Sequence, residues 1–202
     1  FLDDLFVFHY DGRLLLECEG GARALDLYKR LMMYKLRSKI ELDIAEHVPV
    51  YALFGDASDT VIVNIYPDPR DSGMGWRSLD KPQHAHDMPF EEWDRQRIAC
   101  TIPDGSRDMT PEKANIIEMG LDRLGAAAIE KGCFVGQELV ARMLHRGLAK
   151  KHLNTIYSET ADFPANGADI RGDNSLVGTM ASSCGELGLA VLKNSALDQL
   201  PV

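Results

Sequence analysis

The sequence of 202 residues lacks the features that mark several classes of protein. It has no C-x-x-C pair and no close group of His and Cys, so we expect no structural zinc site. Its wholly apolar runs are only a few residues long, far short of the about 20 that a membrane-spanning helix needs. Nothing at its start has the pattern of a signal peptide. Four scattered cysteines in a chain of this size favour free thiols in a reducing, cytoplasmic compartment.

The chain also has fewer positively charged than negatively charged residues. The chain has 22 Lys and Arg against 31 Asp and Glu, a net charge of -9, and a pI near 5.1. This excess of negative charge opposes electrostatic binding to nucleic acid or to anionic lipid, although a local basic patch is not excluded. We therefore expect no stable nucleic-acid binding and no membrane partner. The 45% hydrophobic content is typical of a globular protein with one large domain or two smaller ones.

The N-terminal part predicts strands, then a helix, then strands. Residues 1–18 have the pattern of a hairpin that turns at Asp11-Gly12, and residues 22–36 have apolar side chains at helical spacing. Short β-branched and aromatic runs follow, in residues 39–44, 48–54 and 60–66. This order predicts an α+β layer with a mostly antiparallel sheet.

The remaining chain predicts a loop, helices and a small all-β part. Residues 67–90 are rich in Pro, Gly and Asp and predict a loop. Helices are predicted in residues 89–100, 110–125 and 134–147, the last ending at Gly147. Strand patterns separated by turn residues then predict a small β-barrel or sandwich, with strands in residues 150–158, 175–183 and 187–193. The boundary between the two parts is predicted near residues 146–151.

Residues 131–138, "KGCFVGQE", place one cysteine between a lysine and a glycine-bounded helix start. Backbone N–H groups at the helix start and Lys131 would both favour the thiolate form of Cys133. Most free cysteines are nevertheless inert, so the local pattern alone favours packing over chemistry. A Cys-His hydrolase is a weaker alternative, because none of the six histidines can be paired with the sulfur. His145, twelve residues along the same predicted helix, would be about 18 Å away.

The same eight residues resemble the signature K-G-C-[FY]-x-G-Q-E of the YgfZ family. These folate-binding proteins are related to the aminomethyltransferase (T protein) of the glycine cleavage system and take part in iron–sulfur cluster assembly or repair. The resemblance extends to "RIACTIPDGSRDMTPEKANIIEMGLD" upstream, "RGLAKKHL" downstream and "LYKRLMMYKLRSKIEL" near the start, and so covers almost the whole chain.

The resemblance implies a fold of the α+β class, in which ferredoxin-like α+β lobes form a ring around a folate-sized opening. Residues 1–147 would be the aminomethyltransferase-like folate-binding region, and residues 148–202 a C-terminal β-barrel lobe. A family member would carry a further N-terminal segment before "FLDDLFVF".

The resemblance also implies functional residues. Lys131 and Cys133 would be the working pair, and Glu118 would bind the pterin ring of the folate. The other cofactor-binding residues would shape the signature loop, namely Gly132, Gly136, Gln137 and Glu138. Asp3 and Asp4 resemble the acidic pair near the transferase catalytic position. The alternatives are a solvated helix acid for Glu118 and protective strand-edge charges for Asp3 and Asp4.

The implied function is that of a folate-binding accessory protein for iron–sulfur cluster assembly or maintenance. Its cofactor would be tetrahydrofolate or another reduced folate, and its partners would be iron–sulfur assembly proteins or client enzymes. It would act as an assembly factor rather than an enzyme, in the cytoplasm or alternatively in the mitochondrial matrix. The alternative function is a tetrahydrofolate-dependent aminomethyl or one-carbon transferase assisted by Asp3 or Asp4. In a third interpretation, the signature residues serve only packing and interaction, and the protein binds no folate.

Overall fold

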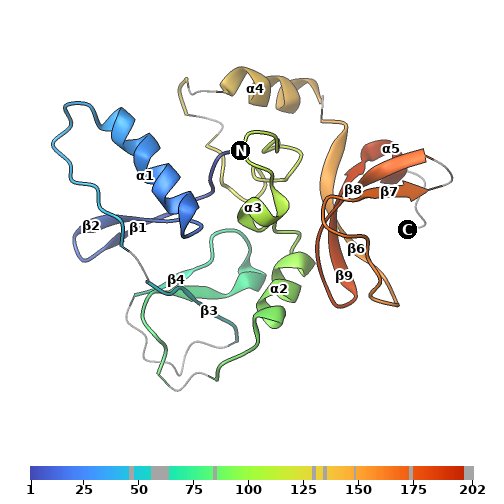
Figure 1. The fold of residues 1–202 in the computed structure, drawn as a ribbon, viewed down its shortest axis with the longest axis horizontal. Coiled ribbons are helices and arrows are strands. Elements are labelled where there is room, and N and C mark those ends of the chain that lie inside the picture. The colour runs from blue at the N-terminus through green and yellow to red at the C-terminus, as the bar shows by residue number, and fades with distance from the viewer. Residues whose placement is uncertain are drawn as a thin grey trace.

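The computed structural model describes residues 1–45, 48–55, 64–83, 86–128, 131–133, 136–147, 149–172 and 175–197. It opens with a hairpin of β1 (Phe6–Tyr10) and β2 (Arg13–Glu17), which pair antiparallel. Asp11 and Gly12 both have positive φ, as the favoured two-residue hairpin turns require. The helix α1 (Ala22–Lys35) follows, so the predicted hairpin and first helix are confirmed (Figure 1).

A second, three-stranded sheet lies below the hairpin in Figure 1. It consists of β3 (Tyr51–Leu53), β4 (Ile65–Pro67) and β5 (Trp76–Ser78), in the antiparallel order β3-β5-β4. The segment predicted as a loop therefore contains β5 and the short 3₁₀ helix η2 (Ser72–Met74). The hydroxyl of Tyr66 donates to the carbonyl of His9 (3.0 Å), which ties this sheet to the hairpin.

The helices that come next agree only partly with the sequence patterns. α2 (Phe90–Ala99) begins directly after Pro89, as predicted. It is followed by the short helix α3 (Gly105–Asp108). The helix predicted in residues 110–125 is wrong, because this segment is a series of turns with positive φ at Glu112, Gly120 and Gly125. The strand predicted in residues 39–44 is also absent from the structure, which describes all of these residues.

The C-terminal part contains α4 (Gln137–Arg146) and a four-stranded antiparallel sheet. Its strands, in the order β6-β9-β8-β7, are β6 (Lys151–Tyr157), β7 (Asp169–Gly172), β8 (Ser175–Cys184) and β9 (Leu187–Lys193); α5 (Asn194–Leu197) follows. Among the described residues this sheet is open, with β6 and β7 at its edges, rather than a closed barrel. The mixed α+β content agrees with the sequence patterns, while the ring of lobes stays a prediction.

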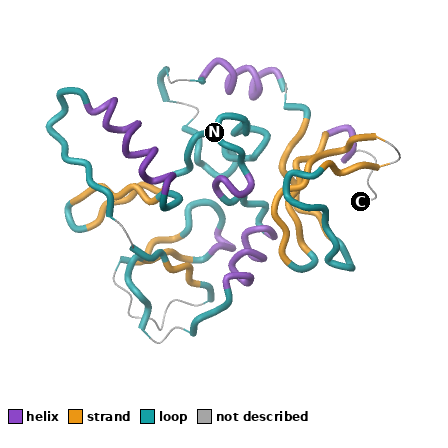
Figure 2. The backbone as a smooth tube through the Cα atoms, in the orientation of Figure 1, coloured by secondary structure: helices purple, strands orange, loops and turns teal. Residues whose placement is uncertain are grey.

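The main core lies where α2 and α3 meet the C-terminal sheet (Figure 2). Ile98 of α2, Ile102, Met109 and Leu189 of β9 are all fully buried there. A smaller cluster of Ile117, Val140 and Ala149 holds α4 against the turn before Glu118.

A buried arginine also joins α2, α3 and β8. The side chain of Arg97 is fully buried, and its Nε donates to Asp94 Oδ1 (2.7 Å). Its Nη1 donates to Asp108 Oδ2 (2.8 Å), and its Nη2 donates to the hydroxyl of Ser182 (2.6 Å). Asp108 in turn accepts from the backbone N–H of Ser182 (2.8 Å). The charge is thus paired and hydrogen-bonded on all sides, as a buried ion requires.

Candidate functional site

The signature loop precedes α4, but the helix begins later than the sequence patterns predicted. Gly136 (φ 88°) is the residue before its first turn, and the N–H of Gly147 (φ 57°) bonds back to Met143 at its end. Both glycines adopt the left-handed conformation that other residues tolerate poorly. Cys133 therefore lies four residues before Gln137, the first residue of the helix, and not directly at its N-terminus.

The residues of this loop are open to solvent. Lys131, Gly132 and Cys133 are exposed, and a Cβ added at Gly132 would meet nothing within 4 Å. Gln137 is half-buried, whereas exposed Glu138 forms an ion pair with Arg142 (2.5 Å), one turn along α4. Phe134 and Val135 of the signature lie outside the described residues, as do His47 and His84. Because the side chain of Cys133 is exposed, the structure does not support the alternative that this cysteine only packs in the core.

Glu118 is positioned by the C-terminal sheet. Its backbone carbonyl accepts from the N–H of Leu153 in β6 (2.7 Å), and its carboxylate forms an ion pair with Lys151 (3.3 Å). Only 18% of its side chain is exposed, so the alternative of a solvated helix acid does not describe it. Two cavities, described below, are however lined neither by Glu118 nor by Lys131 and Cys133.

The larger of these cavities, which we call the aromatic cleft, lies between β3, β5 and the start of α2. Its volume of about 870 Å³ is within the range of small-molecule sites. The rings of Phe90 and Trp93 are 5.2 Å apart, and Arg77, Lys81 and His86 supply polar groups. The described lining residues that give the cleft its aromatic character are Tyr51, Phe54, Trp76, Phe90 and Trp93.

A second cavity of about 200 Å³, the polar recess, adjoins the aromatic cleft. The two share Arg77 and Trp93. Arg77 stands over the ring of Phe6 (4.0 Å to the centroid) and pairs with Glu17 and Asp68. The described lining of the recess comprises Asp4, Phe6, Glu17, Cys18, Glu19, Arg70, Arg77, Trp93, Asp104 and Gly105.

Burial sets the ionisation of the acids in the polar recess. It raises the pKa of Asp4 more than nearby Arg70 lowers it. It likewise raises the pKa of Asp104 in spite of Arg97 and Arg107. Burial and the charges of Asp3 and Asp4 also raise the pKa of the Cys18 thiol. Burial thus favours the neutral thiol of Cys18 and raises the pKa of the carboxyl groups of Asp4 and Asp104.

The two neighbouring acids of the sequence have separate positions. Asp3 pairs with Arg23 of α1 (2.7 Å), which is a structural contact between the segment before β1 and the helix. Asp4 alone lines the polar recess, with Gly105 and Glu19 beside it. Sequence patterns pointed to Asp4 only by resemblance, and they missed Trp76 and Trp93. The available signal was that both tryptophans of the chain lie in or next to the Pro- and Gly-rich segment.

The described residues offer few sites of other kinds. No group of three or more His, Cys, Asp or Glu side chains among them is arranged to hold a metal ion. No described helix is both long and apolar enough to cross a bilayer. All four cysteines are free, and Cys133 is the one with an exposed side chain.

Comparison with known proteins gives relatives named as iron–sulfur cluster assembly factors, although no family model matches. The chain is 28% identical over 206 residues to the mouse protein named iron–sulfur cluster assembly factor IBA57, mitochondrial, and 27% identical over 199 residues to the human one. These matches cover 91% and 88% of the chain, but 57% and 56% of the relatives. A homologue from Phaeosphaeria nodorum is 35% identical over 153 residues, which are 66% of the chain and 36% of that protein.

These names bear on the sequence-based expectations. The chain spans roughly half the length of the mouse and human relatives. The names agree with the expected connection to iron–sulfur cluster assembly, and they give the alternative location, mitochondria, rather than the cytoplasm. The YgfZ name and folate binding stay predictions. Over most of its length, this chain is similar to mitochondrial proteins named as iron–sulfur cluster assembly factors.

Proposed function

We propose that this protein is an iron–sulfur cluster assembly factor of the mitochondrial matrix, with Cys133 as its working thiol. The observation that carries the proposal is the exposed Cys133, which lies in the loop before α4 in a chain similar to proteins of that name. A thiol that contacts a cluster or exchanges with another thiol must be reachable by a partner protein. The other three cysteines are only partly exposed, and burial raises the pKa of each of their thiols.

The loop around Cys133 suits a transient contact better than a stable metal site. A cluster held by the chain alone would need several thiolates together, and the described residues offer no such group. One thiolate can supply part of a coordination sphere that a partner completes. Lys131, two residues away, is a cation that would attract an anionic cluster. We therefore expect iron–sulfur assembly proteins or client enzymes as partners.

Complementation of cells that lack the protein tests this role. Cys133→Ser and Lys131→Ala should fold normally yet fail to restore the activities of iron–sulfur enzymes, while enzymes without clusters stay unaffected. Cys184→Ser is the matched control, because it removes a partly buried thiol that bonds to the carbonyl of Glu91. Full rescue by well-folded Cys133→Ser would end the thiol proposal.

We further propose that the aromatic cleft and the polar recess together hold a reduced folate. A folate combines a flat pteridine, a benzoyl ring and an anionic glutamate tail. The cleft offers aromatic faces for stacking and Lys81 as a cation, and the recess offers carboxylates to the N–H groups of the pteridine edge. In this arrangement Asp4 or Asp104 replaces Glu118 as the pterin partner, since Glu118 lines neither cavity and pairs with Lys151.

Intrinsic fluorescence reports on this site directly, because the two tryptophans of the chain, Trp76 and Trp93, both line the cleft. Tetrahydrofolate should quench their emission in a saturable titration. Trp93→Phe and Lys81→Gln should weaken binding measured by calorimetry, whereas Glu118→Gln should leave it unchanged. Weakening by Glu118→Gln alone would restore the pocket predicted from the sequence, and no binding would remove folate from the proposal.

A folate-dependent one-carbon transferase is a second candidate, favoured by the position of Asp4. Its carboxyl lines the recess beside the proposed folate, and burial raises its pKa above the ordinary value, which is the direction that proton transfer near neutral pH requires. Turnover with an aminomethyl donor and tetrahydrofolate, abolished by Asp4→Asn, would establish this activity. Folate binding without turnover would support the assembly factor alone.

A further inference from the structure

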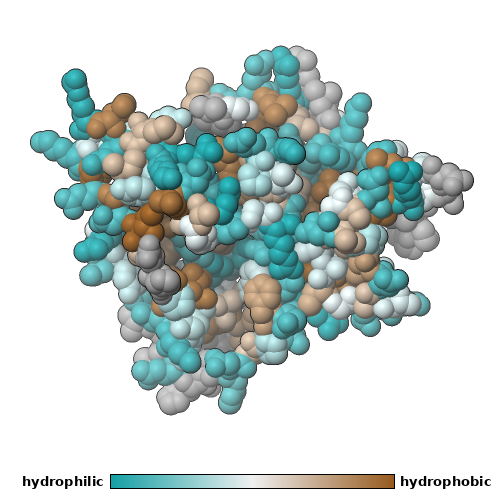
Figure 3. Space-filling model, viewed as in Figure 1, coloured by the Kyte–Doolittle hydropathy of each residue, from teal (hydrophilic) through white to brown (hydrophobic). Residues whose placement is uncertain are grey.

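The helix α1 carries apolar side chains on two of its faces. The inner face, formed by Ala24, Leu27, Tyr28 and Leu31, is half-buried against the rest of the protein. The outer face also carries exposed apolar residues at helical spacing. The acidic composition of the whole chain gives no indication of such a surface. These apolar residues are Leu25, Met32 and Met33, of which Met33 is 67% exposed; Leu36, directly after the helix with a positive φ of 46°, is 85% exposed. Figure 3 shows brown and teal side chains side by side in this part of the molecule.

The same segment concentrates positive charge. Residues 22–39 contain six Lys and Arg against one Asp, a net charge of +5, whereas all other residues together carry -14. Two of these cations have structural roles: Arg23 pairs with Asp3, and Arg30 pairs with Asp26 and Glu112. The remaining four are available to a partner, and they are Lys29, Lys35, Arg37 and Lys39.

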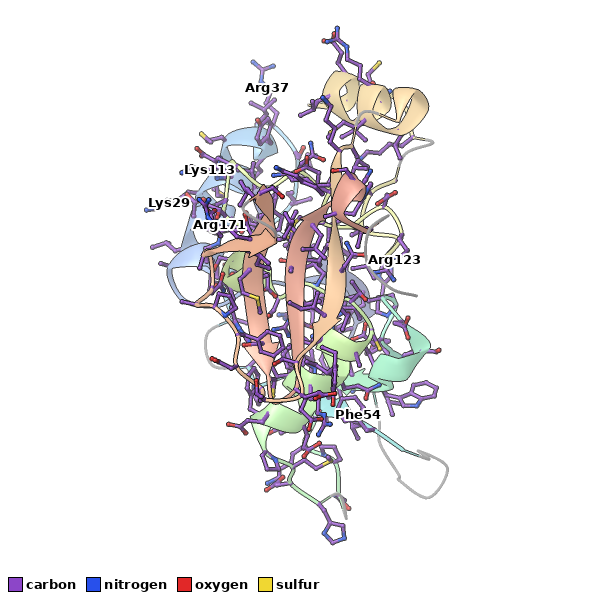
Figure 4. All side chains as sticks on the ribbon, turned by 90° about the vertical axis from the view of Figure 1, so that its right-hand side faces the viewer. Lys29, Arg37, Phe54, Lys113, Arg123 and Arg171 are labelled. Carbon is purple, nitrogen blue, oxygen red and sulfur yellow. The ribbon has the colours of Figure 1, made fainter. Side chains whose placement is uncertain are left out.

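These four cations flank the exposed apolar side chains. Lys29 lies between Leu25 and Met32 on the outer face, and Lys35, Arg37 and Lys39 are close to Leu36 in the sequence, at and just past the end of the helix. Among the described residues, Lys29, Arg37 and Lys39 form no ion pair. Figure 4 shows Arg37 at the top of the molecule and Lys29 at its left edge, and Figure 1 shows α1 on the side opposite the C-terminal sheet.

We propose that the outer face of α1, extended to Lys39, rests on an anionic phospholipid surface. An amphipathic helix with exposed apolar residues and a cluster of four to eight cations has the composition of a peripheral membrane anchor. Met33 and Leu36 would enter the boundary between headgroups and acyl chains. The Lys and Arg side chains would bury their stems there and reach the phosphates with their charged ends.

A protein partner fits this face less well. Protein interfaces are depleted in lysine, whereas three of the four available cations here are lysines. The binding is peripheral, consistent with the absence of a described helix long enough to cross a bilayer. It also refines the expectation drawn from the net charge of -9, because the local charge of this segment has the opposite sign.

Flotation with vesicles tests the proposal. The protein should float with vesicles of equimolar phosphatidylcholine and phosphatidylglycerol and not with phosphatidylcholine alone, and added salt should release it. The triple variant Lys35→Gln/Arg37→Gln/Lys39→Gln should lower partitioning by about a hundredfold, from about 1 kcal/mol for each charge near the surface. Met33→Ser/Leu36→Ser should lower it as well, with the far-ultraviolet circular dichroism unchanged.

The matched control is Arg95→Gln/Lys150→Gln/Arg171→Gln, which removes the same charge from exposed positions elsewhere. It should bind vesicles nearly as the parent protein does. Equal binding to neutral and anionic vesicles, or equal losses in the two triple variants, would overturn the proposal. So would an absence of vesicle binding, and self-association that Met33→Ser/Leu36→Ser abolishes would then assign this face to a protein partner.

Discussion

At the scale of single residues, the four cysteines should differ strongly in reactivity. Cys133 is exposed, while Cys18, Cys100 and Cys184 are partly buried with thiol pKa values raised by burial and nearby acids. Because the thiolate is the reacting form, we expect Cys133 to be alkylated several-fold faster than the others near neutral pH. Peptide mapping after brief treatment with iodoacetamide would measure the order.

Cys133→Ser is the control for that experiment and should remove the fast phase while leaving the slow phases intact. A fast phase that persists in Cys133→Ser would show that one of the partly buried thiols is the reactive one.

Asp4 should make stability depend on pH in a direction opposite to that of most acids. Burial raises its pKa above the ordinary value of 3.8, so the folded state binds the proton more tightly than the unfolded state. Its contribution to stability is therefore complete below about 3.8 and is lost as pH rises through the raised pKa of the folded state. We expect Asp4→Asn to be more stable than the parent at neutral pH, and the gain to vanish in acid.

Urea unfolding at a series of pH values would show this difference. Asp3→Asn is the comparison, because Asp3 pairs with Arg23 and its loss should destabilise the protein at neutral pH. A gain in stability that is the same at every pH would separate the effect from the titration of Asp4.

At the scale of elements, the contact between β8 and β9 depends on Gly178. A Cβ at this position would lie 2.5 Å from the carbonyl oxygen of Val191 and 3.1 Å from Leu192 Cα, both in the neighbouring backbone. Since backbone cannot yield as a flexible side chain does, we expect Gly178→Ala to lower the free energy of unfolding by about 1–3 kcal/mol. Gly20→Ala is the control, because its added Cβ would meet nothing within 4 Å.

Thermal denaturation of the two variants would give the comparison. Equal midpoints would mean that the two strands separate enough to admit a methyl group, and the close approach at Gly178 would then have no energetic role.

Elements fixed by local chemistry were predictable from the sequence. Asp11-Gly12 set the first turn, Pro89 the start of α2 and Gly147 the end of α4. Residues 39–44 alternate as a strand would, but alternation gives a strand only when a partner pairs with it. In the segment that lacks the predicted helix, the N–H of Glu112 bonds to the carbonyl of Phe1, so a distant contact overrides local propensity.

The candidate site was predictable only in part, for a related reason. Cys133 was found because its neighbours in the sequence form a specific pattern. The recess depends on residues that meet only in the fold, such as Asp4 and Asp104, one hundred positions apart in the chain. Arg77 and Trp93 line both the aromatic cleft and the polar recess, and no residue next to either of them in the sequence indicates this role.

At the scale of the whole molecule, Arg97 connects α2 to the C-terminal sheet. Its guanidinium bonds to Asp94, Asp108 and Ser182 with no exposed surface. Arg97→Met would leave buried carboxylates without their cation, so we expect a loss of about 3–5 kcal/mol, the usual result of removing one partner of a buried pair. Equilibrium unfolding in urea would measure it.

Arg95→Met provides the comparison, because Arg95 is an exposed neighbour on the same helix with a distant partner in Glu186 (3.8 Å). Its loss should change stability by less than about 1 kcal/mol. Similar losses in both variants would mean that the buried network adds little beyond helix propensity.

The position of Ser182 has a consequence for the order of events on the ribosome. It follows Arg97 by 85 residues, so the partner on β8 is synthesised about 4 to 17 s after the arginine at ordinary rates of translation. During that interval the guanidinium must stay hydrated, because its buried position does not yet exist. The helix that carries Trp93 into the aromatic cleft can therefore reach its final position only after β8 has been synthesised. A nascent chain released before β8 should bind neither folate nor a partner and should be a substrate for chaperones and proteases.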